Sequence, residues 1–358
     1  MLNILIMAGG KGERFWPKSR ANHPKQLLNL TGEGTLIRET FQRVQNLTDI
    51  SRIFVVTGAE IADSIIRQLP EIPAQNIIIE PESKNTAPCI GLAALHIEMK
   101  DPDGIMAVLP SDHVIKKKDE FCRLLREGEK VVRQFQGVVT LGVKPNRPET
   151  GYGYIKRGQA LIGANNIFAV EKFEEKPDLE KAKQYLAEGE YLWNSGIFIW
   201  KVSEIRKLIR EFLPALHRGL EKIKRTLCSA SYQQTLHKEY HKFKKVSVDY
   251  GVIERIPALI HVIPADIGWD DVGDWGALSR VKKKDQKGNI LLGQNLLALD
   301  LEDCIMETQG KKLVAAIGLN GIIFIETEDA ILICAKNRSQ DIKTVLEKLN
   351  MEGKKQFA

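Results

Sequence analysis

The feature that most constrains the fold is an alternation of short apolar runs with helical patterns through about the first 200 residues. The apolar runs have strand length and cover Leu2–Ala8, Ile53–Thr57, Ile77–Glu80, Ile105–Leu109 and Val138–Val143. The helical segments between them cover Leu36–Gln45, Ile61–Leu69, Thr86–Lys100 and Glu120–Gln134. Apolar strands separated by helices indicate a parallel sheet covered on both faces, with right-handed crossovers. We therefore predict a doubly wound α/β domain with a mostly parallel sheet, whose ligands bind at the carboxyl ends of the strands.

The pattern continues to about residue 285 and then changes. Further strands are predicted through Phe173 and over 194–200 and 259–263, with a helix over 178–188 and a mainly helical stretch over 202–257. Residues 289–335 hold short apolar runs of strand character separated by turn residues, and a closing helix is expected over 339–349. The sequence therefore predicts an α/β domain over residues 1–285 and a small all-β domain over 286–358.

Composition and charge exclude several classes of protein. Hydrophobic residues make up 43% and charged residues 27%, which is typical of folded globular chains and not of disordered ones. No uncharged apolar stretch approaches the roughly 18 residues of a membrane span, and the N-terminal apolar run lacks the basic start of a signal peptide. The net charge of +6 comes from basic runs without interleaved aromatic residues, so no nucleic-acid partner is expected. The five scattered cysteines, with no CxxC pair, favour a reducing cytoplasm over disulfides or a zinc site.

A glycine-rich loop follows the first apolar run. Gly9, Gly10 and Gly12 let backbone N–H groups approach a phosphate without a Cβ in the way. A Walker A loop is absent, and the dinucleotide fingerprint fails at Phe15. The basic residues that follow the glycines are Arg14, Lys18, Arg20 and Lys25. This combination suits a triphosphate, and the alternative is a tight strand-to-helix turn with solvated lysines.

Two groups of carboxylates are candidate metal ligands. Asp112 directly follows the apolar run at 105–109. The second group has four aspartates in nine residues, namely Asp266, Asp270, Asp271 and Asp274. Like charges this close repel each other unless cations offset them. Asp112 and one of these aspartates could together bind Mg²⁺, while the alternative for Asp112 is a cap on the next helix.

Polar residues at other strand ends and turns are candidates for binding a sugar phosphate. Lys176 precedes a proline at a strand end and is suited to hold a monophosphate, and Glu175 can accept hydrogen bonds from sugar hydroxyls. Gly153 allows backbone contact with a sugar ring, and Asn194 begins a predicted strand. The alternatives are a surface turn for Glu175 and Lys176, a simple hairpin for Gly153 and an ordinary strand start for Asn194.

The ordered set of motifs resembles the mannose-1-phosphate guanylyltransferase family of sugar-nucleotide pyrophosphorylases. The resemblance covers about residues 3–280 and is carried by segments 9–17, 24–26, 80–88, 173–177, 194–198 and 269–273, with further matches at 328–334 and 338–343. Phe15 and Glu13 depart from the residues that the family often has at these positions. Alone, the segment 80–88 is typical of a capped helix start. The resemblance adds that this segment lines the nucleotide-base pocket.

The resemblance also implies a fold, an activity and a set of site residues. The fold is a Rossmann-like nucleotidyltransferase domain followed by a short left-handed β-helix. The reaction is GTP plus α-D-mannose 1-phosphate giving GDP-mannose plus pyrophosphate, with Mg²⁺ as cofactor. The residues expected to act in catalysis are Arg14, Lys25, Asp112 and Asp271, of which Asp112 and Asp271 bind the metal. Nucleotide-binding residues are expected at Ala8, Gly9, Gly10, Gly12, Arg14, Lys25, Glu80, Asn85, Thr86 and Ser111. Sugar-phosphate-binding residues are expected at Gly153, Glu175, Lys176 and Asn194.

Other interpretations stay open at this point. A sibling enzyme could use another nucleoside triphosphate or hexose, and a regulatory subunit of this fold could bind sugar nucleotides without catalysis. The second alternative is disfavoured because the loop cations and the metal aspartates are all present. A β domain of about 60 residues has a marginal core by itself, so it is expected to pack on the catalytic domain or on a second subunit. A homodimer is the assembly that we expect. The sequence ends at Ala358 without a cupin-type isomerase domain, so no isomerase activity is expected.

Overall fold

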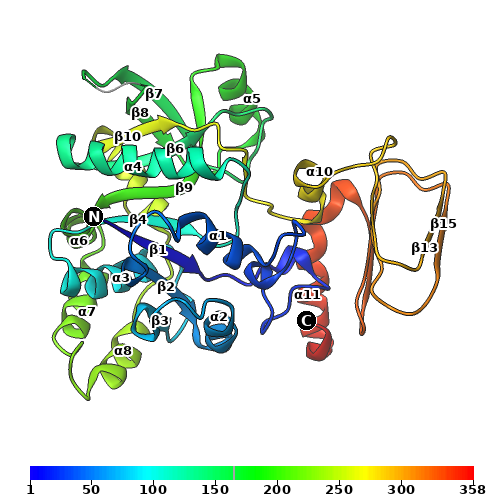
Figure 1. Cartoon of the computed structure of the whole chain (residues 1–358), viewed down its shortest axis with the longest axis horizontal. Coiled ribbons are helices and arrows are strands. Elements are labelled where there is room, and N and C mark those ends of the chain that lie inside the picture. The colour runs from blue at the N-terminus through cyan, green and yellow to red at the C-terminus, as the bar shows by residue number, and fades with distance from the viewer. Residues whose placement is uncertain (164–165) are drawn as a thin grey trace. The chain divides into compact units, whose positions relative to one another are not determined.

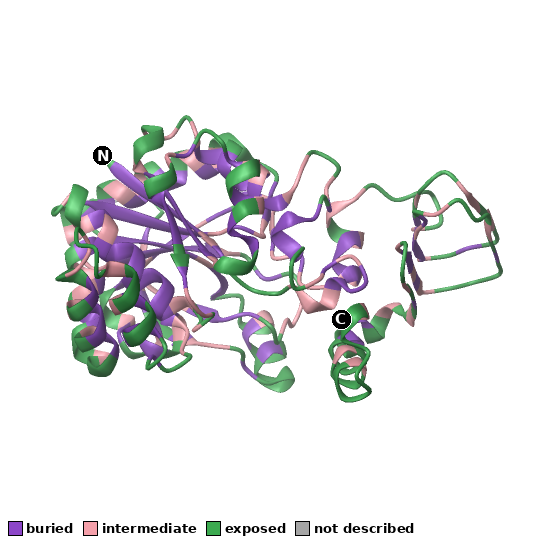
Figure 2. Cartoon of the chain, turned by 90° about the horizontal axis from the view of Figure 1, so that it is seen from below, coloured by how far each residue is buried: buried purple, intermediate pink, exposed green. Residues whose placement is uncertain are grey.

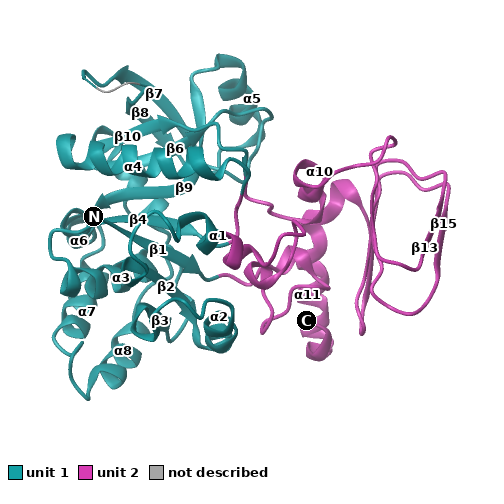
Figure 3. Ribbon diagram, viewed as in Figure 1, with its two compact units in different colours: residues 1–9, 40–111, 115–269 teal, residues 10–39, 112–114, 270–358 magenta. Residues whose placement is uncertain are grey.

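A computed structural model of the chain describes residues 1–163 and 166–358 and divides into two compact units (Figure 3). Unit 1 comprises residues 1–9, 40–111 and 115–269, and unit 2 comprises residues 10–39, 112–114 and 270–358. The segment after the first strand thus belongs to the same unit as the C-terminal region. These units are defined by packing, and the domain boundary at residue 285 stays a prediction.

Unit 1 is built on a nine-stranded sheet with the order β3-β2-β1-β4-β9-β6-β10-β8-β7 (Figure 1). Its strands are β1 (Leu2–Ala8), β2 (Ile53–Gly58), β3 (Ile77–Glu80), β4 (Ile105–Pro110), β6 (Val138–Val143), β7 (Tyr154–Ala160), β8 (Phe168–Glu174), β9 (Tyr191–Lys201) and β10 (Ile260–Pro264). Strands β3, β2, β1 and β4 are parallel, and Leu5 of β1 lies between Phe54 and Val108. Strand β9 runs antiparallel to β4 and β6. The α/β fold is confirmed. Parallel pairing joins β3, β2, β1 and β4 and also β6 with β10, whereas β7, β8 and β9 pair antiparallel with their neighbours.

Helices cover both faces of this sheet. They are α2 (Ala62–Gln68), α3 (Thr86–Lys100), α4 (Lys118–Phe135), α5 (Leu179–Glu188), α6 (Val202–Phe212), α7 (Pro214–Lys224), α8 (Tyr232–Tyr240) and α9 (Val248–Gly251), while α1 (Leu36–Val44) contains residues of both units. Gly128 of α4 lies against Ile199 of β9, whereas the next residue, Trp200, packs in the core formed with α3 and α6. Successive side chains of a strand point to opposite faces, so α4 and α3 cover opposite sides. The strands between them are buried (Figure 2).

Unit 2 contains two small sheets whose strands alternate along the chain. Its elements are α10 (Leu278–Val281), β12 (Ile290–Leu292), β13 (Leu296–Leu299), β14 (Ile305–Glu307), β15 (Val314–Ile317), β16 (Ile322–Glu326), β17 (Ile331–Ala335) and α11 (Ile342–Met351). One sheet has the order β12-β14-β16-β17 and the other pairs β13 with β15. The pairs β12–β14, β14–β16 and β13–β15 are parallel, as in a β-helix whose coils stack on one another. The short strands β5 (Val114–Ile115) and β11 (Trp269–Asp270) lie where the chain passes from one unit to the other.

The glycine-rich segment shares its core with the C-terminal region of unit 2. Phe15 and Trp16 belong to one buried cluster with Trp275, Ile305 and Ile342. The ring centroids of Phe15 and Trp275 lie 5.1 Å apart in an edge-to-face arrangement, and the Trp275 indole N–H donates to the Trp16 carbonyl at 2.9 Å. Aromatic side chains bury large areas, so this cluster fixes the segment that follows the glycines.

No helix in the described part of the chain combines the length and the apolar character needed to cross a membrane. The cysteines at 89, 122, 228, 304 and 334 are free thiols.

Candidate active site

The glycine loop in unit 2 requires glycine at position 12 for two reasons. Gly12 has a φ of 61°, in the left-handed region that side chains disfavour. A Cβ on Gly12 would also collide with the side chain and backbone of Lys25. The Gly12 carbonyl accepts hydrogen bonds from the Ser19 hydroxyl at 2.8 Å and the Phe15 N–H at 2.9 Å. The loop therefore lies directly against Lys25 and is held there.

Lys25 joins the two predicted metal ligands. Its side chain is 7% exposed, and its ammonium donates to Asp112 Oδ2 at 2.8 Å and to the Asp271 backbone carbonyl at 2.5 Å. Burial alone would raise the pKa of the Asp112 carboxyl, but Lys25 and His113 outweigh that effect and hold the pKa below its ordinary value. Asp112 is therefore ionised at neutral pH. The capping role considered for Asp112 is not what the structure shows, because its carboxylate binds Lys25.

The backbone around Asp271 is held in an unusual conformation. Val272 is fully buried and has a φ of 44°, which is rare for a β-branched residue and stores strain. Its N–H donates to Asp270 Oδ1 at 2.8 Å, and Asp270 also receives two hydrogen bonds from Arg280, at 2.5 and 2.9 Å. Arg280 Nη2 lies 3.9 Å from Asp271 Oδ1. The Asp270 carboxylate thus binds Arg280 and also stabilises the turn at Val272. This turn directs the Asp271 carbonyl toward Lys25.

The other two aspartates of the predicted cluster have structural or surface roles. Asp266 is 90% exposed and pairs with Lys117 at 2.5 Å. Asp274 accepts a hydrogen bond from the Ala277 N–H at 3.1 Å and caps the short helix that begins at Trp275. The repulsion inferred from four close aspartates is therefore relieved largely by Lys117, Arg280 and a helix cap, and only Asp271 lies beside Lys25.

The oxygen ligands of this cluster suit a hard divalent cation. Among the described residues, no group of three or more His, Cys, Asp or Glu side chains is arranged to hold a metal ion. Asp112 and Asp271 supply two carboxylates. Magnesium commonly binds to one or two protein carboxylates and takes its remaining ligands from phosphate oxygens and water. The residues present therefore fit a metal ion that binds together with a nucleotide.

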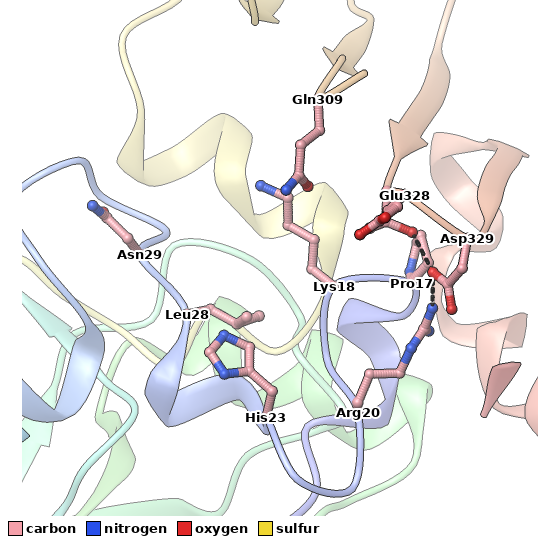
Figure 4. Close-up of a pocket in the computed structure, with 10 residues that line it drawn as sticks. Pro17, Lys18, Arg20, His23, Leu28, Asn29, Gln309, Glu328 and Asp329 are labelled. Atoms are coloured by element: carbon pink, nitrogen blue, oxygen red, sulfur yellow. Dashed lines mark hydrogen bonds and ion pairs between the residues drawn. The ribbon is translucent and has the colours of Figure 1, made fainter. Parts of the chain in front are cut away.

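Two of the cations after the glycines lie at a different place from Lys25. Lys18 pairs with Glu307 at 2.5 Å, and Arg20 pairs with Asp329 at 2.8 Å. Both line a pocket of about 540 Å³ within unit 2, together with Gln309 and other residues (Figure 4). Lys18 and Arg20 are thus paired with carboxylates of the β-helix region and are not grouped with Lys25, while the binding of a triphosphate stays a prediction. Arg14 keeps a buried Nε without a hydrogen-bond partner among the described residues.

The predicted base-binding segment, residues 80–88, begins at the end of β3 in unit 1. Glu80 is 4% exposed and accepts a hydrogen bond from the Tyr240 hydroxyl at 2.6 Å. A Cβ on Gly9 would lie 3.6 Å from Glu80 Oε1, so the carboxylate lies beside Gly9 within unit 1. Burial raises the pKa of Glu80 to about 7, although the Tyr240 hydrogen bond opposes the shift. Glu80 is therefore an unusually basic buried carboxylate.

Three further predicted nucleotide-binding side chains make local contacts in unit 1. The Asn85 side chain accepts from the Thr86 N–H at 2.8 Å and caps α3, and the Thr86 hydroxyl accepts from the Val248 N–H at 2.8 Å. The capped helix start is therefore present in the structure. The Ser111 N–H donates to the Met7 carbonyl at 3.1 Å beside buried Ala8, and the Ser111 hydroxyl is buried without a partner in the described residues.

The four predicted sugar-phosphate residues come together in unit 1. A Cβ on Gly153 would lie 2.5 Å from Glu175 Oε2 and 3.2 Å from the Asn194 Cβ. Lys176 pairs with Glu175 and has a φ of 51°. The Asn194 amide donates to Asp249 at 3.0 Å. Burial and the nearby negative charge of Asp249 raise the pKa of Glu175, and Lys176 opposes this shift. The sequence thus identified residues that cluster in space.

Sequence reasoning missed three residues that complete these clusters. Asp249 contacts Asn194, Tyr240 contacts Glu80, and Arg280 holds Asp270. Asp249 and Tyr240 lie far along the chain from the residues that they contact. Arg280 lies outside the motifs that the sequence analysis identified. Ser247–Tyr250 did contain one usable signal, because an acidic residue follows a capping serine in an otherwise helical stretch.

Comparisons with known proteins show which family the chain belongs to. A model of the nucleotidyl transferase family matches residues 3–288, and a model of the mannose-phosphate isomerase/GMP-like β-helix domain matches residues 294–349. A mannose-1-phosphate guanylyltransferase from Klebsiella pneumoniae is 37% identical, and the match covers 100% of this chain and 76% of that protein. One from Escherichia coli shows the same identity and coverage.

Solved structures show the same fold. The structure described as a mannose-1-phosphate geranyltransferase from Thermus thermophilus has a TM-score of 0.86 at 32% identity, covering 98% of this chain and 99% of that one. A mannose-6-phosphate isomerase from Helicobacter pylori has a TM-score of 0.61 at 23% identity over 75% of this chain and 99% of that one, which shows the fold alone. Nucleotidyl transferases of this family generally use a divalent metal ion. The chain belongs to the mannose-1-phosphate guanylyltransferase family of nucleotidyl transferases.

Proposed function

We propose that the protein transfers a guanylyl group from GTP to α-D-mannose 1-phosphate, forming GDP-mannose and pyrophosphate. The observation that carries the proposal is the buried Lys25 ammonium between Asp112 and Asp271, in a chain of this family. An oxygen of the sugar phosphate attacks the α-phosphorus in line, and the bond to the departing pyrophosphate breaks. A phosphate dianion is already a nucleophile, so no general base is needed. Catalysis then consists of positioning and charge neutralisation.

Each cluster has a role in this proposal. Arg14 and Lys25 neutralise the triphosphate, whose backbone contacts come from the glycine loop. Lys176 holds the sugar phosphate, and Glu175 and Asn194 bind the hexose. The base is bound by the segment that includes Glu80, Asn85 and Thr86, with Ala8 and Ser111 at neighbouring strand ends.

Mg²⁺ is the proposed metal ion, with Asp112 and Asp271 as its ligands. When bound, it would offset negative charge on the phosphate oxygens. Support comes from the depressed pKa of Asp112, which keeps that carboxylate ionised, and from the oxygen-only donor set.

The proposed assembly is a homodimer formed through the outer face of β13 and β15. Leu297, Leu299 and Ile317 are 51%, 48% and 66% exposed, and Leu299 pairs directly with Ile317. Exposed apolar side chains that are grouped on one sheet mark interaction surfaces, and a second copy is the occupant that we propose. The proposed location is the cytoplasm, which the free thiols of the described cysteines support.

The two phosphate sites can be separated by kinetics. Lys25→Met should mainly impair the use of GTP, whereas Lys176→Met should mainly raise the KM for mannose 1-phosphate. Loss of a charge-assisted contact costs on the order of 1.5–3 kcal/mol, which corresponds to a fall in kcat/KM of roughly 10- to 100-fold. Lys183→Met is a matched control, because this lysine is 55% exposed on α5. Exchanged phenotypes would show that the two substrates are assigned the wrong way round.

A further inference from the structure

We propose that Asp249 is a specificity-determining residue of the sugar-phosphate site, where it and the Asn194 amide together recognise one hydroxyl group of the hexose. The inference rests on the proposed function, because it adds a residue to the sugar side of the same reaction. It follows from the way the structure orients one amide and one carboxylate.

The orientation of the Asn194 amide is fixed. Its side-chain oxygen accepts hydrogen bonds from the Gly196 N–H at 3.1 Å and from the Thr140 hydroxyl at 3.3 Å. The Gly196 N–H can only donate, so the amide oxygen faces it and the NH₂ group faces the other way. That NH₂ group donates to Asp249 Oδ1 at 3.0 Å. One of its two protons is thereby used, and the second is left for another acceptor.

Asp249 is also held in place by its backbone. It is the second residue of α9, and the Ser247 hydroxyl accepts from the Tyr250 N–H at 3.3 Å to cap this short helix. The preceding residue, Val248, donates its N–H to the Thr86 hydroxyl at 2.8 Å, which ties α9 to the start of α3. The carboxylate is therefore presented from a fixed position. Asn194 occupies Oδ1, and Oδ2 is the atom that we assign to the substrate.

The surroundings of Asp249 favour neutral groups of the ligand that donate hydrogen bonds. The Glu175 side chain is 6% exposed, and its Oε2 is buried beside Gly153 without a hydrogen-bond partner among the described residues. Burial raises the pKa of both Glu175 and Asp249, and Lys176 opposes the shift in each. Buried acceptors without donors are costly, and sugar hydroxyls can satisfy them without adding charge. Lys176, which pairs with Glu175, is the cation for the phosphate of the same ligand.

A hydroxyl is the group that Asn194 and Asp249 would recognise together. A hydroxyl can accept a hydrogen bond from the Asn194 amide and donate one to Asp249 Oδ2 at the same time. A hydrogen atom in its place would leave the second N–H of the Asn194 amide and Asp249 Oδ2 without this partner, although Asn194 and Asp249 would still contact each other. Sites built around a hydroxyl discriminate strongly against analogues that lack it.

The experiment measures steady-state kinetics with mannose 1-phosphate and its 2-, 3- and 4-deoxy analogues. The unmodified protein should lose roughly 10²-fold or more in kcat/KM with one analogue. Asp249→Asn should lower kcat/KM for mannose 1-phosphate by about 10- to 100-fold, mainly through KM, because a charged partner is lost. The KM for GTP should change by less than about twofold. The variant should no longer discriminate against the same analogue, whereas a structural defect would not remove that preference selectively.

Asp103→Asn is the matched control, since Asp103 lies exposed in a turn of the same unit. If Asp249→Asn fails to fold, Asp249→Ser offers a smaller acceptor for the same series. Discrimination that survives in the variant, or an equal rise in both KM values, would overturn the role of Asp249 and leave the proposed function standing. A lack of turnover of mannose 1-phosphate by the unmodified protein would instead overturn the proposed function and this inference with it.

Discussion

Lys25 and Lys176 show how two identical side chains acquire different tasks from their surroundings. Lys25 is 7% exposed and is held by a carboxylate and a backbone carbonyl, so it adds charge at a fixed point. Lys176 is 51% exposed and pairs with Glu175. The sequence predicted both residues, because they follow strand ends in recognisable motifs. It could not predict the contact of Asp249 with Asn194, because that contact depends on which distant segments meet in the fold.

Asp271→Asn should reduce turnover by roughly 10²-fold or more with little change in fold. The backbone carbonyl of Asp271 would still bind Lys25, so only the side-chain charge is removed. Asp266→Asn is the control, because Asp266 is 90% exposed. EDTA should abolish turnover of the unmodified protein, and excess Mg²⁺ should restore it. Near-normal turnover of Asp271→Asn in Mg²⁺ would refute the assigned metal ligand.

Glu80 should make the stability depend on pH. Its pKa is raised from 4.5 to about 7, so the protonated form is favoured in the folded state. The contribution of protonated Glu80 to the free energy of unfolding is fully present below pH 4.5 and is lost as the pH rises through 7. The free energy of unfolding therefore falls by at most roughly 3 kcal/mol over this pH range.

Urea unfolding at several pH values tests this prediction. Glu80→Gln should become more stable relative to the unmodified protein between pH 5 and 8, by an amount on the order of 3 kcal/mol. The exposed Glu60→Gln should show no such trend. Parallel stability curves for Glu80→Gln and the unmodified protein would mean that the pKa of Glu80 is not raised by folding.

At the scale of elements, the sequence predicted strands well and their partners less well. The predicted bounds of β1, β3 and β6 agree with the structure, because continuous apolar runs report burial directly. Strand β9 begins at Tyr191, three residues before its predicted start, where Trp193 pairs with Val143. Its antiparallel pairing with β4 and β6 was not predictable, since periodicity reveals that a strand is buried and not which strand lies beside it.

The glycine loop offers a test at this scale. Gly12→Ala combines an unfavourable φ with a collision against Lys25, and it should destabilise the protein by about 1–3 kcal/mol and strongly reduce activity. Gly32 also has a positive φ, of 103°, but a Cβ there would meet no atom within 4 Å. Gly32→Ala should therefore show only the conformational cost of about 1 kcal/mol. Equal effects on activity would show that the contact between position 12 and Lys25 is unimportant.

At the scale of the whole chain, the C-terminal region shares a buried core with the segment that follows the glycine loop. Phe15 and Trp16 share their core with Ile305 and Ile342, which places residues from both ends of the sequence in one compact unit. Truncation after Lys287 would remove half of that core, so it should abolish activity as well as stability. The sequence predicted the β-helix region through a family resemblance, but its contact with the glycine segment is visible only in the folded chain.

A milder change isolates the proposed assembly. Leu299→Glu combined with Ile317→Glu places charges on the outer face of β13 and β15, which is exposed in the single chain. Light scattering coupled to gel filtration should show a dimer for the unmodified protein and a monomer for the variant, with little change in thermal unfolding of the fold itself. A variant that remains dimeric would show that the subunits associate through another surface.

The most direct test of the central claim is release of pyrophosphate by the purified full chain, measured across a panel of nucleotides and sugar 1-phosphates with Mg²⁺. GTP, ATP, UTP, CTP and dTTP are each paired with mannose 1-phosphate and with glucose 1-phosphate. The account predicts the highest kcat/KM for GTP with mannose 1-phosphate and stoichiometric formation of GDP-mannose. A higher kcat/KM with another pair would reassign the substrates, and no pyrophosphate release from any pair would contradict the account.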